Sequence, residues 1–197
     1  MPAGLMLGAL CALHGLRPLV VEQRHAPVTH SRSIGIQSPS LALFEQIGLL
    51  NDLLDAGNRI NTGTAYLEAT RMGDLHFSRQ PVPHPYIVTC PQLVTERLLE
   101  ARLNQLAPGA LRRAHLVEHL DVTDAHCTVR TRNGTTFVAP WCFACDGHDS
   151  FIRTAAGIPV TAHAYPDSYL MGDFDDPPGT RDTAAVHLCR DGLVESL

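Results

Sequence analysis

The chain contains no lysine, and all fifteen of its basic residues are arginine. This absence excludes a P-loop lysine and a Schiff-base lysine, so a phosphate would have to be bound by arginine, backbone N–H groups or helix ends. A basic stripe is also missing, because 15 basic and 20 acidic residues are scattered along the chain and give a net charge of −5. We therefore expect no nucleic-acid partner.

Long apolar runs are absent as well. No run reaches the ~18 residues that a membrane span needs, so we expect no membrane association. The six cysteines lie far apart in a chain of 197 residues, which is typical of reduced thiols and predicts a cytoplasmic protein. The Cys142–Cys145 spacing has no second pair and no histidine cluster beside it, so no metal site is predicted.

Helical and strand-like patterns alternate along the sequence. Helices are expected at 3–14, 39–54 and 92–106, and strands at 18–22, 64–69, 75–77, 86–89, 114–120, 127–131, 135–139 and 141–145. The alternating part is typical of a dinucleotide-binding α/β domain, and the antiparallel part indicates a second sheet.

The first candidate ligand site lies at the start of the chain. Pro2-Ala3-Gly4 opens the first helix, and the following apolar strand ends at Glu22. In a nucleotide-binding βαβ unit a glycine allows close helix–strand packing, the helix start binds the pyrophosphate and the acid binds ribose hydroxyls. An ordinary helix–strand pair followed by a chance acid explains the same pattern.

The second candidate is the segment 145–153, Cys-Asp-Gly-His-Asp-Ser-Phe-Ile-Arg, which follows an apolar run and precedes a helix. An acid and a glycine at a strand end can place a carboxylate and bare backbone against a ligand. Arg153 would lie one turn into the helix, within reach of a phosphate or of the Asp146 carboxylate. The alternative is a simple strand-to-helix turn.

The third candidate combines a loop and a helix start. The loop 30–36 holds small residues and Arg32, which suits a planar ligand, and Gln92 follows Pro91 at the start of a helix. A surface loop and a solvated glutamine are the alternatives.

In this order the motifs resemble the class A flavoprotein monooxygenases, the para-hydroxybenzoate hydroxylase and phenol hydroxylase-like family. The Asp-Gly motif with its arginine is the specific part, and the similarity runs through nearly the whole chain. It implies a Rossmann-like FAD-binding domain, lacking its first strand, with part of a mixed β-sheet substrate domain. The implied FAD-binding parts are 1–61 and 91–158, the substrate-sheet strands 62–90, and the start of a truncated substrate domain 159–197.

The resemblance also implies a set of cofactor-binding residues. Gly4 would lie at the FAD pyrophosphate and Glu22 at the adenosine ribose, with Gln23 beside it. Arg32 and Gln92 would contact the flavin nucleotide.

The later motif would serve both cofactors. Asp146 and Gly147 would support binding of FAD and NAD(P)H, and Arg153 would hold the motif in place. The implied protein is an FAD-dependent monooxygenase that uses NAD(P)H and O2 to hydroxylate an aromatic, phenolic substrate, the cofactor carrying the hard chemistry.

The chain departs from the family pattern at both ends. Met1 stands where the first strand and its glycines are expected, and the family's later Gly-Asp motif would lie beyond Leu197, since Gly172-Asp173 comes too early. We therefore expect an N-terminal fragment. The main alternative is a truncated, non-catalytic remnant that binds FAD weakly or not at all.

Two other enzyme classes fit less well. A flavin-dependent halogenase is expected to carry a Trp-x-Trp element and a catalytic lysine, but Trp141 is the only tryptophan. An NAD-dependent dehydrogenase leaves the 146–153 motif unexplained. No catalytic residue is assigned, and Tyr86, Tyr165 and Tyr169 are candidates to lie near the substrate.

Overall fold

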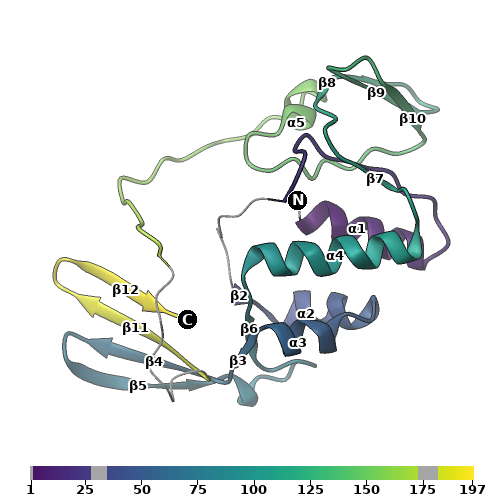
Figure 1. Ribbon diagram of the computed structural model, residues 1–197. Helices are drawn as coiled ribbons and strands as arrows, with labels where there is room; N and C mark the ends of the chain where they lie inside the picture. Colours follow the sequence, from purple (N-terminus) through teal and green to yellow (C-terminus); the bar gives the residue numbers. More distant parts are fainter. Residues whose placement is uncertain (1, 28–34, 173–181) are drawn as a thin grey trace. The chain divides into compact units, whose positions relative to one another are not determined.

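The protein divides into two compact units. A computed structural model describes residues 2–27, 35–172 and 182–197 (Figure 1). The first unit combines Met1–Pro27 with Leu103–Asp173, and the second combines Val28–Arg102 with Phe174–Leu197. Each unit has its own sheets and is described separately.

The first unit opens on a helix and a short parallel strand pair. Helix α1 (Pro2–Leu13) agrees with the predicted helix to within one residue at each end. β1 (Val20–Val21) pairs in parallel with β7 (Leu111–Arg112). The strand is shorter than predicted and only half-buried, because β7 is its one partner among the described residues.

The closest contact between α1 and β1 falls at Gly8. A Cβ added to Gly8 would lie 2.7 Å from Val20 Cγ2 and 3.3 Å from Leu103 Cδ1. A Cβ added to Gly4 would meet Cys145 Cβ at 3.5 Å and Val20 Cγ1 at 3.8 Å, which are ordinary van der Waals distances. The close helix–strand packing that the sequence attributed to Gly4 is therefore provided by Gly8.

An antiparallel sheet with strand order β10-β9-β8 completes the first unit, together with the short helix α5 (Phe151–Ala155). Its strands are β8 (Val117–Val122), β9 (Cys127–Thr131) and β10 (Thr136–Ala139). Gly134, at φ 83°, makes the turn between β9 and β10. The strand predicted at 141–145 is wrong: this segment has no strand partner among the described residues, and Trp141 is 79% exposed.

Two helices replace the single helix predicted at 39–54. α2 (Ser38–Gln46) and α3 (Leu50–Ala56) are separated by Gly48, whose φ of 74° lies in the left-handed region that ends a helix. The N-cap of α2 is Gln37 rather than the expected Ser38. Leu41, Phe44, Ile47 and Leu53 are buried in the second unit's core.

A small antiparallel sheet follows these helices in the second unit. β6 (Ile87–Thr89) lies between β2 (Gly35–Ile36) and β3 (Asn58–Ile60). Gly57 joins α3 to β3, and a Cβ added there would lie 2.5 Å from the carbonyl oxygen of Thr89. Because that oxygen belongs to the backbone, the position has no room for a side chain.

A four-stranded sheet with strand order β12-β11-β4-β5 brings together the middle and the end of the chain (Figure 1). Its strands are β4 (Thr62–Leu67), β5 (Thr70–His76), β11 (Thr183–Cys189) and β12 (Gly192–Ser196). β11 runs parallel to β4, and the other pairs are antiparallel. On one face the rings of Tyr66 and His187 stack with centroids 4.5 Å apart.

Helix α4 (Gln92–Leu106) has the bounds that the sequence predicted, and Leu99 and Leu103 on it are buried. With 15 residues it is the longest helix in the described part of the chain. None of the described helices has both the length and the apolar character to cross a membrane.

Candidate functional site: a helix start, a strand end and an Asp-Gly turn

The start of α1 has the features of an anion-binding helix end. Backbone N–H groups in the first turn of a helix lack partners within the helix and carry partial positive charge. The first turn of α1 contains no acidic side chain, and Gly4 lies in it without a side chain of its own. This helix end can therefore accept a phosphate.

Glu22 lies immediately after β1, and its backbone is held on both sides. Its N–H donates to the carbonyl oxygen of Arg112 at 2.8 Å, and its carbonyl oxygen accepts from the N–H of His115 at 3.0 Å. The Oε1 atom of Glu22 accepts from the N–H of Arg24 at 2.9 Å. Gln23 beside it is exposed. Val20, two residues before Glu22, lies 3.8 Å through its Cγ1 from a Cβ added to Gly4, so β1 runs past the start of α1.

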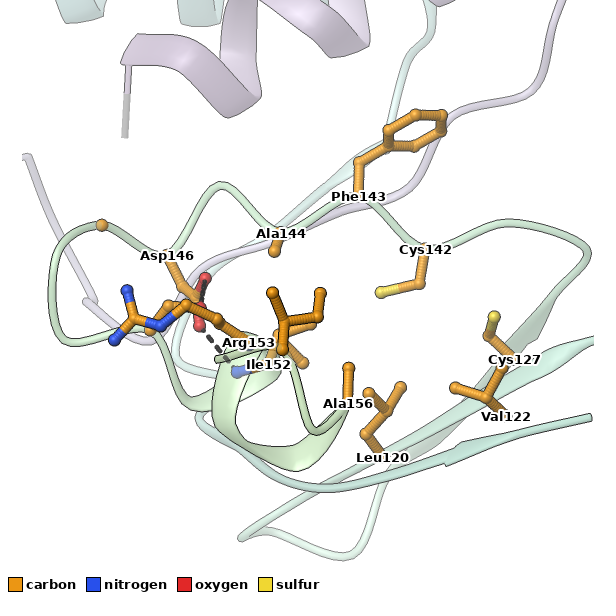
Figure 2. A pocket seen from close by; sticks show the side chains of 13 residues that line it. Leu120, Val122, Cys127, Cys142, Phe143, Ala144, Asp146, Ile152, Arg153 and Ala156 are labelled. Atoms are coloured by element: carbon orange, nitrogen blue, oxygen red, sulfur yellow. Dashed lines mark hydrogen bonds between the residues drawn. The ribbon is translucent and has the colours of Figure 1, made fainter. Parts of the chain in front are cut away.

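The Asp146 carboxylate organises the turn into α5. Its Oδ1 accepts from the Ser150 hydroxyl at 2.5 Å, and its Oδ2 accepts from the N–H of Ile152 at 3.0 Å (Figure 2). The Ser150 hydroxyl oxygen in turn accepts from the N–H of Arg153 at 2.9 Å and caps the helix. Both carboxylate oxygens are therefore used to shape the protein's own loop.

These contacts also set the ionisation of Asp146. Burial alone would raise its pKa, but hydrogen bonds from Ser150 and from the backbone N–H groups of Ile152, Asp146 and Phe151 outweigh burial and hold the pKa below its ordinary value of 3.8. The group is a carboxylate at neutral pH.

Gly147 and Arg153 complete this turn. Gly147 has φ 93°, a backbone conformation that favours glycine. The shape of the turn therefore restricts the choice of residue after Asp146. Arg153 donates through Nη1 to the carbonyl oxygen of His148 at 2.9 Å. The guanidinium thus bonds the loop backbone, whereas the sequence suggested a phosphate or the Asp146 carboxylate as its partner.

A pocket of about 530 Å³ opens beside this turn within the first unit. Figure 2 shows Asp146 and Arg153 at one end and the thiols of Cys127 and Cys142 at the other. Aliphatic side chains, including Leu120 and Ile152, line much of the remainder. Its volume is in the range of small-molecule sites.

Burial disfavours the thiolate form of the two cysteines near the turn. Burial raises the pKa of both Cys142 and Cys145 above the ordinary value of 9.0. Protonated thiols are poor nucleophiles and poor metal ligands. Among the described residues, no group of three or more histidine, cysteine, aspartate or glutamate side chains is arranged to hold a metal ion.

Sequence reasoning missed a residue next to Gln92. Nε2 of Gln92 donates to Oε1 of Glu96, one turn further along α4, at 2.8 Å. Glu96 is fully buried. The spacing of four residues on one helix face was available as a signal, but a glutamate in a helix ordinarily indicates a solvated face. Arg32 lies outside the described residues.

The tyrosines named as substrate-site candidates lie in different environments. Tyr86 is buried in the second unit, with the Arg59 guanidinium carbon 3.8 Å from its ring centroid. Tyr165 and Tyr169 are more than 80% exposed, in a segment of the first unit without helix or strand.

Ser150→Ala is expected to lower the free energy of unfolding by about 1 kcal/mol at neutral pH, because it removes the helix cap and one Asp146 contact. The folded-state pKa of Asp146 is depressed, so its contribution is present above pH 3.8 and is lost as the pH falls through the lower folded-state value. Urea denaturation at neutral pH and at acid pH measures the unfolding free energies of the variant and of wild type. The difference between these two free energies should be smaller at acid pH. Ser150→Thr keeps the hydroxyl and serves as the control; equal losses in both variants would contradict the capping role.

Comparison with known proteins identifies the family. The family model described as "FAD binding domain" matches residues 1–189. Rifampicin monooxygenase from Streptomyces venezuelae is 29% identical over 175 residues, which cover 88% of this chain and 36% of that protein. YhjG from Bacillus subtilis, described as an uncharacterized aromatic compound monooxygenase, is 32% identical over 163 residues, which cover 80% of this chain and 32% of YhjG.

The fold agrees with solved structures. A crystal structure of a mutant of PqsL from P. aeruginosa superimposes with a TM-score of 0.88 at 21% identity, covering 98% of this chain and 54% of the PqsL chain. This confirms the predicted α/β fold class. The chain spans about a third of the length of the two curated relatives. On the family match and these similarities, the chain belongs to the FAD-binding domain family of the flavoprotein monooxygenases.

Proposed function

We propose that this chain supplies the FAD-binding part of a monooxygenase that hydroxylates an aromatic, phenolic substrate with NAD(P)H and O2. The observation that carries the proposal is the FAD-binding family match along residues 1–189, since the cofactor determines the class of chemistry. The relatives named as monooxygenases support the reaction type.

The residues at the start of the chain fit FAD. The acid-free first turn of α1 and the missing side chain at Gly4 leave a helix end that suits the pyrophosphate. Glu22, held at the end of β1, suits the adenosine ribose, and Gln23 is exposed beside it. Gln92 and Arg32 are proposed to contact the flavin nucleotide.

Asp146, Gly147 and Arg153 are proposed to act through the shape of their turn. The two oxygens of Asp146 bind Ser150 and Ile152, so the carboxylate supports the cofactors by holding the loop. Gly147 then presents backbone without a side chain, and Arg153 secures the His148 carbonyl. NAD(P)H is proposed as the co-substrate of this region.

The chemistry divides between cofactor and protein. FAD, when bound, would supply electron transfer and oxygen activation. The chain's own residues would bind the nucleotide, fix its orientation and exclude water. The proposed FAD-binding parts are 1–61 and 91–158, and the proposed substrate parts are 62–90 and 159–197. The sheet shared by β4, β5, β11 and β12 supports the grouping of 62–76 with 183–196, whereas β6 pairs with β2 and β3.

The remaining parts of the proposal concern partners and location. A small aromatic substrate and O2 are the expected partners, with no nucleic acid and no membrane. A cytoplasmic location is proposed because dispersed cysteines, all free here, are typical of proteins that keep their thiols reduced. The alternative is a chain that belongs to the same family but binds FAD weakly or not at all.

The test is a flavin titration of the purified 197-residue chain. We expect saturable quenching of FAD fluorescence and a flavin absorption band at roughly 450 nm that remains with the protein after gel filtration. FMN should bind more weakly, because it lacks the adenosine that the Gly4 and Glu22 region is proposed to hold. A chain with a cooperative melting transition and no FAD binding would favour the alternative.

A further inference from the structure

Glu96 is a buried carboxylate that the proposed function does not yet explain. It lies in α4 with no exposed surface. Its Oε1 accepts the hydrogen bond from Nε2 of Gln92 at 2.8 Å. Its Oε2 is buried and has no hydrogen-bond partner among the described residues.

Stability of the fold does not account for a carboxylate at this position. A buried, partly unsatisfied acid costs free energy, because it loses water without replacing all of its hydrogen bonds. A methionine of similar volume would fill the same space, favour the helix equally and carry no such penalty. A role for this acid is therefore better sought in its hydrogen bond to its neighbour than in the stability of the core.

The neighbour is the side chain of Gln92. Because Oε1 of Glu96 accepts from Nε2 of Gln92, the nitrogen end of the Gln92 amide faces Glu96. This contact selects one of the two orientations of the amide and turns its carbonyl oxygen away from the carboxylate. A glutamine with free rotamers would otherwise lose side-chain entropy whenever it bound a ligand.

We propose that Glu96 is a positioning residue for the flavin site, which holds the Gln92 amide in the orientation that receives the flavin nucleotide. The inference rests on the proposed function, because it assumes that Gln92 contacts FAD. In this proposal Glu96 does not touch the cofactor. It acts from the core of the second unit, through its hydrogen bond to Gln92.

The proposal predicts opposite effects of one substitution on folding and on binding. Glu96→Met removes the acceptor together with the unsatisfied acid. We expect its apo-protein melting temperature to equal or exceed that of wild type, while FAD binds about tenfold more weakly. Glu96→Gln keeps a carbonyl oxygen that can accept from Gln92, so it should recover most of the affinity. Arg97→Met, at an exposed position of the same helix, is the matched control.

A double-mutant cycle with Gln92→Leu isolates the coupling. If Glu96 acts through Gln92, adding Glu96→Met to Gln92→Leu should weaken FAD binding no further. Independent, additive losses would overturn the inference, as would an unchanged FAD affinity in Glu96→Met. A parallel fall of melting temperature and affinity in both Glu96 variants would show a purely structural role and also overturn it. If wild type itself bound no FAD, the proposed function would fail first, and the inference with it.

Discussion

The Gly57→Ala variant is expected to lose about 2–4 kcal/mol of unfolding free energy. The added Cβ would lie 2.5 Å from the backbone oxygen of Thr89 and 2.9 Å from Val88 Cγ1. The backbone at Gly57 is extended, at φ −124° and ψ −178°, so any residue can adopt it. The loss of stability therefore comes from steric overlap and not from backbone strain. To relieve the overlap, α3 or β6 would have to move, and both are part of the second unit's packed core.

Urea denaturation of Gly57→Ala and wild type measures this loss. Gly35→Ala is the matched control, because it lies in β2 beside the same strand and its Cβ would meet Ile87 Cγ2 at an ordinary 3.7 Å. We expect its unfolding free energy to stay within about 0.5 kcal/mol of wild type. Equal denaturation midpoints for Gly57→Ala and wild type would show that the α3–β6 contact relaxes without cost.

Gly4→Ala is expected to weaken FAD binding by tenfold or more while leaving the fold intact, an estimate of about 1.4 kcal/mol or above. Its Cβ meets only ordinary contacts in the protein, so the packing of α1 tolerates it. The proposed pyrophosphate site lies at this helix start, where the added methyl group would sterically hinder the close approach of the phosphates to the backbone N–H groups.

Gly8→Ala is the matched comparison, and we expect it to lower the stability of the fold, whereas Gly4→Ala is expected to lower the affinity for FAD. Its Cβ would lie 2.7 Å from Val20 Cγ2, and overpacking of this kind costs about 1–3 kcal/mol. The gain in helix propensity, about 1 kcal/mol, offsets only part of the loss. Melting temperature and FAD titration of both variants separate the two roles. Loss of stability in Gly4→Ala, or an unchanged FAD affinity in it, would refute the assignment of Gly4 to the pyrophosphate.

Local patterns predicted the elements that carry their own signals. Helix α4 is bounded by Pro91 and by the Pro108-Gly109 turn, and its bounds were predicted to the residue. The β9–β10 hairpin has its glycine where the Asn133-Gly134 pair indicated. Gly48 was equally visible, yet an apolar pattern that continued past it favoured one helix where the structure has two.

Elements that depend on distant partners were predicted less well. The apolar run at 141–145 has the composition of a strand, but a strand exists only where another strand accepts its hydrogen bonds. Among the described residues no such partner lies beside it. The parallel pairing of β11 with β4 likewise joins segments more than a hundred residues apart, and no local pattern specifies it.

The sequence alone was sufficient to identify the family and the cofactor, because the Pro-Ala-Gly helix start, the acid after a strand and the Asp-Gly motif are short local patterns with fixed chemistry. Tertiary structure decided how these residues are used. It assigned the close packing to Gly8, turned both Asp146 oxygens toward α5, and placed Glu96 in the core behind Gln92. Burial and hydrogen-bond geometry arise only when separate segments pack together, so spacing along the chain does not contain them.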